Sequence, residues 1–162
     1  MSAEPQAIQP AQPHTVPFMV DGLVFSDDRG VFAPFFDKER MKDVADAMGE
    51  AKRVYYVQNG ARGTVRGFHY HEHEWKLFII SSGSAKFVAL DPEHPEQKFT
   101  FVSSERKNNV IVIPPRFANG WVSLEDDTTL ICVSNLTTSE SRVDDKRFEP
   151  YTWGDVWAVT PR

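Results

Sequence analysis

The sequence predicts an all-β fold, because short apolar runs alternate with turn signals along most of its 162 residues. Turn signals such as Asn59-Gly60 and Ser82-Gly83 separate these runs. Short strands at such regular spacing are typical of a β-sandwich or a β-barrel. The predicted strands span residues 53–58, 65–71, 76–81, 85–90, 99–102, 110–113 and 128–134.

One short segment, near residues 37–48, predicts a helix instead. Its apolar residues follow the i, i+3, i+4, i+7 spacing of a helix face, and the segment ends before Gly49. These apolar residues are Met41, Val44, Ala45 and Met48.

The domain organisation follows from length and local composition. We expect residues 17–162 to form one domain, since this length suits a single core. Residues 1–16 are rich in Pro, Ala and Gln, which predicts a flexible N-terminal arm. An arm that adds a strand to a neighbouring subunit is the alternative.

Composition excludes several classes of partner. The net charge of −5 disfavours nucleic-acid binding. No apolar run is long enough to span a bilayer, and the N-terminus lacks the features of a signal peptide. The single cysteine, Cys132, excludes an intrachain disulfide and suits a reducing compartment. We therefore expect a cytoplasmic protein that binds neither nucleic acid nor a membrane.

The most informative stretch is a strand that carries three histidines. Alternation along a strand places His69, His71 and His73 on one face. Such a row of imidazoles suits a metal site, a catalytic site or a solvated edge. The apolar run that begins at Leu77 follows closely, which places the histidines near the core and favours a functional role.

This stretch resembles the first cupin motif, G-x5-H-x-H-x4-E-x6-G. Gly63, His69 and His71 fall on it, but Lys76 stands at the position of the metal-binding Glu. In the second motif Asn119 replaces the third metal-binding His. A cation repels a divalent metal and an amide is a poor substitute for imidazole. We expect no metal and no other cofactor.

Four short pieces in the same order resemble the dTDP-4-dehydrorhamnose 3,5-epimerase family. They are Asp-Asp-Arg-Gly at 27–30, Val-Arg-Gly-Phe-His-Tyr at 65–70, Lys-Leu at 76–77 and Ile-Pro-Pro-Arg-Phe-Ala-Asn-Gly at 113–120. Members of the family are metal-free cupins that act on nucleotide-linked 4-keto-6-deoxy sugars. The resemblance implies a cupin-type double-stranded β-helix, or jelly-roll barrel, and a homodimer.

The chemistry of such sugars gives these residues a rationale. A keto group acidifies the hydrogens on neighbouring carbons, so a base can form an enolate whose reprotonation on the other face inverts the centre. His69 is the expected base, because its pKa lies near working pH. Lys76 and Arg66 are expected to stabilise the enolate oxygen. On a regular strand Arg66 would point to the face opposite that of His69, unless a bulge at Gly67 turns it inward.

Further residues complete the predicted site. Tyr70 and His71 are candidate catalytic groups beside the base. Arg29 is a candidate for the diphosphate, since its planar guanidinium suits phosphate oxygens. Asn119 and Tyr56 are the remaining candidates for substrate binding.

The chain also departs from the family's pattern. The family's catalytic Tyr falls on Ile131, the Glu that contacts the base falls on Pro34, and the Asp partner of the catalytic His falls beyond the last residue. The missing proton donor leaves four candidates, namely Tyr55, Tyr56, Tyr70 and His71. Three carboxylates are candidates for orienting His69, namely Asp144, Asp145 and Glu149.

Two other functions compete with an epimerase. The segments Arg53-Val-Tyr-Tyr56 and Arg66-Gly-Phe-His69-x-His71 also resemble the sugar-nucleotide 3,4-ketoisomerases, in which paired histidines shuttle protons. A non-catalytic sugar-nucleotide-binding cupin is the third possibility. Because His69, Lys76 and Arg66 occur together, we expect an enzyme rather than a binding protein, and an epimerase ahead of a ketoisomerase. The family resemblance implies a role in surface polysaccharide or deoxysugar biosynthesis.

Overall fold

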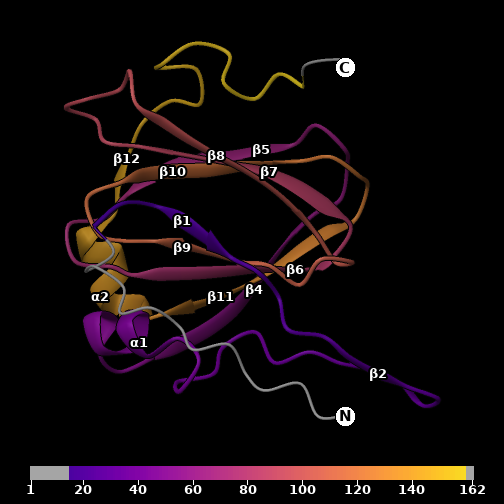
Figure 1. Cartoon of the computed structure of the whole chain (residues 1–162). Coiled ribbons are helices and arrows are strands. Elements are labelled where there is room, and N and C mark those ends of the chain that lie inside the picture. The colour runs from indigo at the N-terminus through magenta and orange to yellow at the C-terminus, as the bar shows by residue number, and fades with distance from the viewer. Residues whose placement is uncertain (1–14, 160–162) are drawn as a thin grey trace.

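Two antiparallel five-stranded sheets face each other in the computed structural model, which describes residues 15–159 (Figure 1). The first sheet has the order β1 (Phe18–Val20), β9 (Val110–Ile113), β6 (Lys76–Ser82), β11 (Thr128–Ser134) and β4 (Arg53–Asn59). The second has the order β12 (Lys146–Arg147), β5 (Val65–Tyr70), β10 (Ala118–Ser123), β7 (Ser84–Leu90) and β8 (Lys98–Ser104). This jelly roll confirms the predicted all-β class. The arm predicted for residues 1–16 lies outside the described residues, apart from Thr15 and Val16.

The central strands are buried on both faces, which explains why they are apolar without alternation. On β6, Phe78 and Ile80 point between the sheets, whereas Leu77 points to the outer face of the first sheet. On β7, Phe87 lies between the sheets and Val88 lies on the outer face of the second. The molecule therefore has one core between the sheets and a smaller apolar cluster outside each sheet.

The predicted helix is present as α1 (Lys42–Met48), preceded by a turn in which Met41 N–H donates to the Asp37 carbonyl. Val44 and Met48 of α1 pack on the outer face of the first sheet. In residues 15–159, neither helix has the length and apolar character that crossing a bilayer would require.

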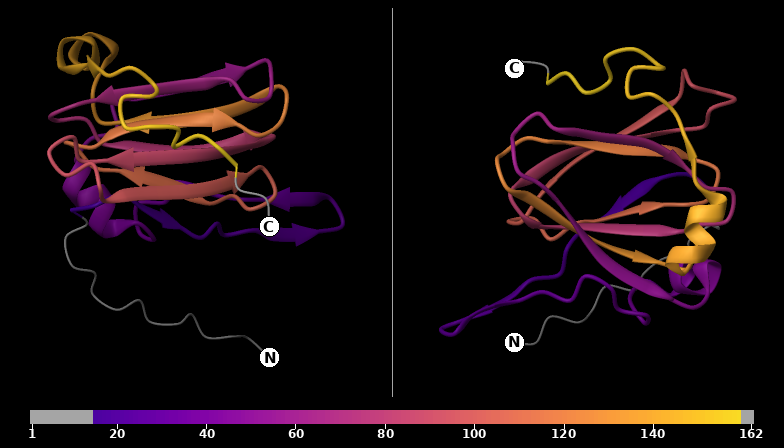
Figure 2. Two further views of the ribbon diagram at one scale, coloured as in Figure 1. Left: turned by 90° about the horizontal axis from the view of Figure 1, so that it is seen from above. Right: turned by 180° about the vertical axis from the view of Figure 1, so that it is seen from behind.

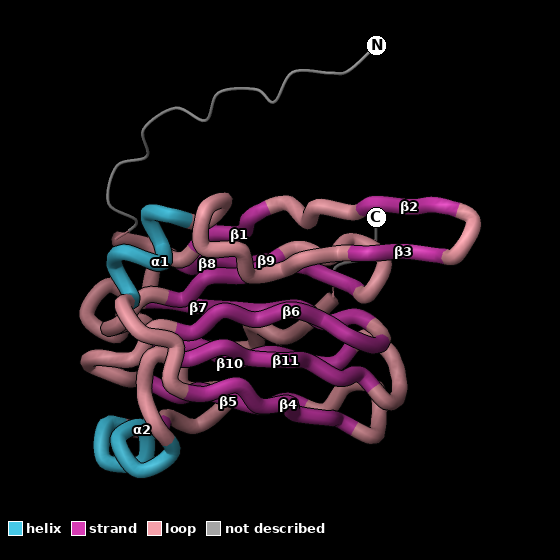
Figure 3. The backbone as a smooth tube through the Cα atoms, turned by 90° about the horizontal axis from the view of Figure 1, so that it is seen from below, coloured by secondary structure: helices cyan, strands magenta, loops and turns pink. Residues whose placement is uncertain are grey.

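A second helix, α2 (Thr138–Asp144), was not predicted, because it has no apolar period. A capping box stabilises its first turn: the Thr137 hydroxyl accepts from the Glu140 N–H, and the Glu140 carboxylate accepts from the Thr137 N–H. In the sequence, the Thr-x-x-Glu spacing of this capping box is the feature that indicates the start of the helix. Both helices lie at the same end of the sandwich (Figure 3).

Two peripheral segments complete the fold. The hairpin of β2 (Phe25–Asp27) and β3 (Gly30–Phe32) projects from the end opposite the helices (Figure 3). The aromatic segment after β12 crosses the outer face of the second sheet (Figure 2), where Trp157 lies 4.8 Å from Phe68, measured between ring centroids.

Candidate functional site

A cavity of about 270 Å³ lies between the two sheets and beside α2. Both sheets line it, and α2 closes one side with Ser141 and Arg142. Of the predicted site residues it gathers five, namely His69, His71, Lys76, Arg66 and Asn119.

The predicted bulge at Gly67 is what brings Arg66 into this pocket. Asn119 pairs with His69 and Trp121 pairs with Arg66, so β5 has one residue more than β10 between these two pairs. Gly67 has a φ of 147°, in the region that favours glycine. A Cβ atom there would lie 2.7 Å from the Gly120 Cα. Arg66 Nε then donates to Asn59 Oδ1 at 2.6 Å.

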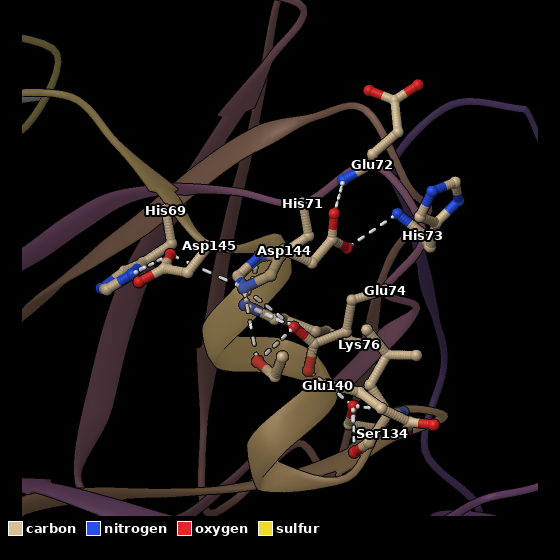
Figure 4. Close-up of polar contacts among 12 residues, drawn as sticks. His69, His71, Glu72, His73, Glu74, Lys76, Ser134, Glu140, Asp144 and Asp145 are labelled. Atoms are coloured by element: carbon tan, nitrogen blue, oxygen red, sulfur yellow. Dashed lines mark hydrogen bonds and ion pairs between the residues drawn. The ribbon is translucent and has the colours of Figure 1, made fainter.

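His69 is held by a carboxylate. Its Nδ1 lies 3.1 Å from Asp145 Oδ1, an arrangement in which Nδ1–H donates and Nε2 keeps its lone pair (Figure 4). Burial is the main influence on the pKa of His69 and outweighs the opposing hydrogen bond to Asp145, so this pKa lies below its usual value. His69 is therefore neutral at pH 7 and suited to accept a proton.

Of the three carboxylates that were candidates for orienting His69, Asp145 is the one that contacts it. Burial works against its ionisation, but hydrogen bonds from Arg147 and His69 keep the pKa of Asp145 below its usual value. Asp144 has a different task, since its carboxylate accepts the backbone N–H groups of Glu72 and His73 at 3.0 and 2.9 Å (Figure 4). The residues at the C-terminal end of α2 thus position both His69 and the loop after β5.

His71 differs from His69 in that both of its ring nitrogens are occupied. Lys76 Nζ lies 3.2 Å from Nδ1, and Glu74 Oε2 lies 3.0 Å from Nε2 (Figure 4). Lysine can only donate and a carboxylate can only accept, so His71 carries its proton on Nε2. The two histidines are thus fixed as opposite tautomers.

Glu74 is the centre of this network and was not identified from the sequence. Its side chain is fully buried and accepts from four groups, namely Arg53 at 2.7 Å, Ser134 at 2.5 Å, Ser141 at 2.9 Å and His71. Burial opposes ionisation, but the hydrogen bond from His71 and the charge of Lys76 hold the pKa of Glu74 well below its usual value. Its charge is what allows Lys76, only 6% exposed, to remain inside the protein.

Several predicted residues lie away from the pocket. Tyr70 points outward and donates to Glu72 at 2.9 Å, and Tyr56 is 73% exposed on the outer face of β4. Arg29, with its side chain 87% exposed, pairs with Asp27 on the projecting hairpin. His73 was expected on the face of His69 and His71, but β5 ends at Tyr70 and His73 is exposed in the following loop. The structure does not bring these four residues to the site.

The side chains at the metal-binding positions of a cupin are engaged here in other hydrogen bonds. Lys76 uses the Nδ1 lone pair of His71, and Asn119 Nδ2 donates to the carbonyls of His69 and Phe117 at 3.1 and 3.0 Å. In residues 15–159, no group of three or more His, Cys, Asp or Glu side chains is arranged to hold a metal ion. The residues present do not fit a cupin metal.

The pocket is strongly cationic although the chain is acidic. Against one lining carboxylate, Asp145, five cationic side chains line it, namely Arg53, Arg66, Lys76, Arg142 and Arg147. Such a site favours a small anionic ligand. A histidine base beside a buried ammonium can also remove a carbon-bound proton and stabilise the resulting oxyanion.

Comparisons with known proteins agree with this chemistry. A family model described as dTDP-4-dehydrorhamnose 3,5-epimerase matches residues 17–146. The spore coat polysaccharide biosynthesis protein SpsL of Bacillus subtilis (strain 168) is 25% identical over 148 residues, which cover 85% of this chain and 92% of SpsL.

Solved structures share the fold at lower identity. ChmJ, a 3'-monoepimerase from Streptomyces bikiniensis, superposes with a TM-score of 0.74 at 19% identity, covering 94% of this chain and 83% of ChmJ. The rmlC epimerase of Mycobacterium tuberculosis gives 0.73 at 16%, covering 85% and 70%. The 3,4-ketoisomerase QdtA from Thermoanaerobacterium thermosaccharolyticum gives 0.68 at 17%, covering 83% and 90%.

The buried network generates a stability prediction. Glu74→Gln removes the charge and leaves one acceptor oxygen for four donors, with Arg53 and Lys76 unpaired inside the protein. We expect the free energy of unfolding, measured by urea denaturation, to fall by about 3 kcal/mol or more. The same change at exposed Glu72, which pairs with Arg116, is the control and should leave stability almost unchanged. Equal stability of the two variants would contradict the role given to Glu74.

Proposed function

Since this chain belongs to the dTDP-4-dehydrorhamnose 3,5-epimerase family, we propose that it is an isomerase of nucleotide-linked 4-keto-6-deoxy sugars. It would invert a centre beside the keto group by enolisation. The observation that carries the proposal is a neutral His69, held by Asp145, in the same cationic pocket as buried Lys76.

Each residue of the pocket has a role in this reaction. His69 Nε2 takes the proton from the carbon beside the keto group, while Asp145 stabilises the imidazolium that forms. Lys76 and Arg66 stabilise the oxygen that gains the negative charge. Asn119 contributes to substrate binding through its amide oxygen, since its Nδ2 group already donates to two carbonyls.

The state of His71 favours epimerisation over ketoisomerisation. A two-histidine shuttle needs a second imidazole with a free nitrogen, but Lys76 and Glu74 engage both nitrogens of His71. His71 is therefore a positioning residue for Lys76 in this proposal. A non-catalytic binding protein would need neither the oriented base nor the buried cation.

The biological setting is also proposed by analogy. The relative SpsL is described as a spore coat polysaccharide biosynthesis protein, which supports a role in surface polysaccharide or deoxysugar biosynthesis. ChmJ was solved with dTDP-quinovose, which supports a dTDP-linked substrate. The expected cytoplasmic location stays a prediction.

We also propose a homodimer that uses the projecting hairpin. Phe25, Val31 and Phe32 are 52%, 67% and 66% exposed on β2 and β3, an apolar surface with no core behind it. A second copy of the chain would cover it.

The dimer is tested by sedimentation velocity. The intact chain should sediment with twice the chain mass, and the double variant Val31→Asp/Phe32→Asp should sediment as a monomer. Tyr151→Asp, at an aromatic residue that is 62% exposed elsewhere, is the control and should remain dimeric. A monomeric wild type would contradict the proposal.

The reaction is tested by proton NMR in D₂O with dTDP-4-keto-6-deoxyglucose. Wild-type protein should exchange the hydrogen at C3, C5 or both and form an epimer. His69→Ala should slow this at least 100-fold, in line with the usual contribution of a general base. His94→Ala, at an exposed histidine outside the pocket, should have no effect.

Other outcomes would redirect the assignment. A 3-keto product would favour a ketoisomerase. Saturable binding without exchange would favour a non-catalytic binding protein.

A further inference from the structure

We propose that Tyr55 donates the proton that completes inversion, from the face of the sugar opposite His69. This inference rests on the proposed epimerase function and supplies a group that function lacks. The family's donor position was expected at Ile131, which cannot donate a proton.

The first support is the placement of Tyr55 and His69 on opposing walls. Tyr55 lies on β4 in the first sheet, His69 lies on β5 in the second, and both line the cavity between the sheets. Inversion requires a base and an acid on opposite faces of the same carbon. A sugar ring between the sheets would have one of these groups on each side.

Among the residues of the first sheet that line the cavity, only Tyr55 is free to act as a proton donor. Val57, Phe78 and Leu130 line this wall and carry no transferable proton. Arg53 keeps its proton in proteins and is bound to Glu74. Lys76 is bound to His71 and is needed at the enolate oxygen. Tyr55 is the proton donor that remains among the described residues of this wall.

Strand geometry shows why β11 does not supply the donor. Leu130 and Cys132 point into the core between the sheets, so Ile131 points to the outer face by alternation. Cys132 is fully buried and does not line the cavity. Cys132 pairs with Tyr55 of the neighbouring strand β4. The Tyr55 phenol therefore lines the pocket next to β11, which itself supplies no proton donor there.

The Tyr55 hydroxyl keeps its proton in this environment. Burial, together with the neighbouring Cys132 thiol, raises the pKa of Tyr55 far above its usual value, so the hydroxyl is protonated at neutral pH. The Arg53 guanidinium lies 4.7 Å from the centre of the Tyr55 ring and would stabilise the phenolate left after donation.

The proposed step balances without any further reactant except water. His69 Nε2 takes the proton from carbon, and the C–H electron pair forms the enolate, whose oxygen faces Lys76. The enolate carbon then forms a new C–H bond with the Tyr55 proton, and the carbonyl is restored. Water returns a proton to the phenolate and accepts one from the His69 imidazolium.

The test separates loss of inversion from loss of enolisation. With dTDP-4-keto-6-deoxyglucose in D₂O, Tyr55→Phe should still exchange substrate hydrogen for deuterium within about 10-fold of the wild-type rate, since His69 is intact. Formation of the epimer should fall at least 100-fold. Tyr151→Phe, at an exposed tyrosine outside the pocket, should match wild type in both readouts. Thermal unfolding checks that Tyr55→Phe is folded.

If Tyr55→Phe proves unstable, 3-fluorotyrosine at position 55 keeps the hydroxyl but makes it more acidic. It should change the rate of epimer formation while deuterium exchange stays within about 10-fold of the wild-type rate. Epimer formation at the wild-type rate in folded Tyr55→Phe, or equal loss of exchange and epimerisation, would overturn the assignment. Wild-type protein that neither exchanges nor epimerises would instead overturn the proposed function, and this donor with it.

Discussion

The buried carboxylate of Glu74 is the group around which the polar wall of the pocket is arranged. It accepts hydrogen bonds from β4, β11, α2 and the loop after β5, and so joins two strands of the first sheet to a helix and to that loop. It also offsets the charge of Lys76, since an ammonium in the interior without a counter-ion would be very costly. The position of the Lys76 ammonium at the pocket depends on this one charge.

The same carboxylate makes two neighbouring histidines chemically different. Glu74 and Lys76 together hold His71 with its proton on Nε2, whereas Asp145 holds His69 with its proton on Nδ1. His69 consequently has a free lone pair facing a pocket that also holds a fixed cation. A strand that looks like a symmetrical row of imidazoles thus yields one base and one positioning group, which is the division of roles that proton abstraction beside a carbonyl requires.

The sequence was a good guide wherever a local rule decided the outcome. Short apolar runs between turn signals predicted strands such as β6 and β7, and the glycine at position 67 predicted the bulge that turns Arg66 inward. It was a poor guide where contacts join distant segments. Nothing in the local pattern selects Asp145, which is 76 positions from His69, because its location depends on how α2 docks. Neighbouring residues on a strand point to opposite faces, so Tyr56 points away from the pocket while Tyr55 points into it.

¹⁵N NMR of the imidazole rings at pH 7 would show whether one network fixes His69 and His71 as opposite tautomers. We expect a protonated Nδ1 and an unprotonated Nε2 for His69, and the reverse for His71. Two rings in the same tautomer, or a His71 signal averaged between tautomers, would contradict it.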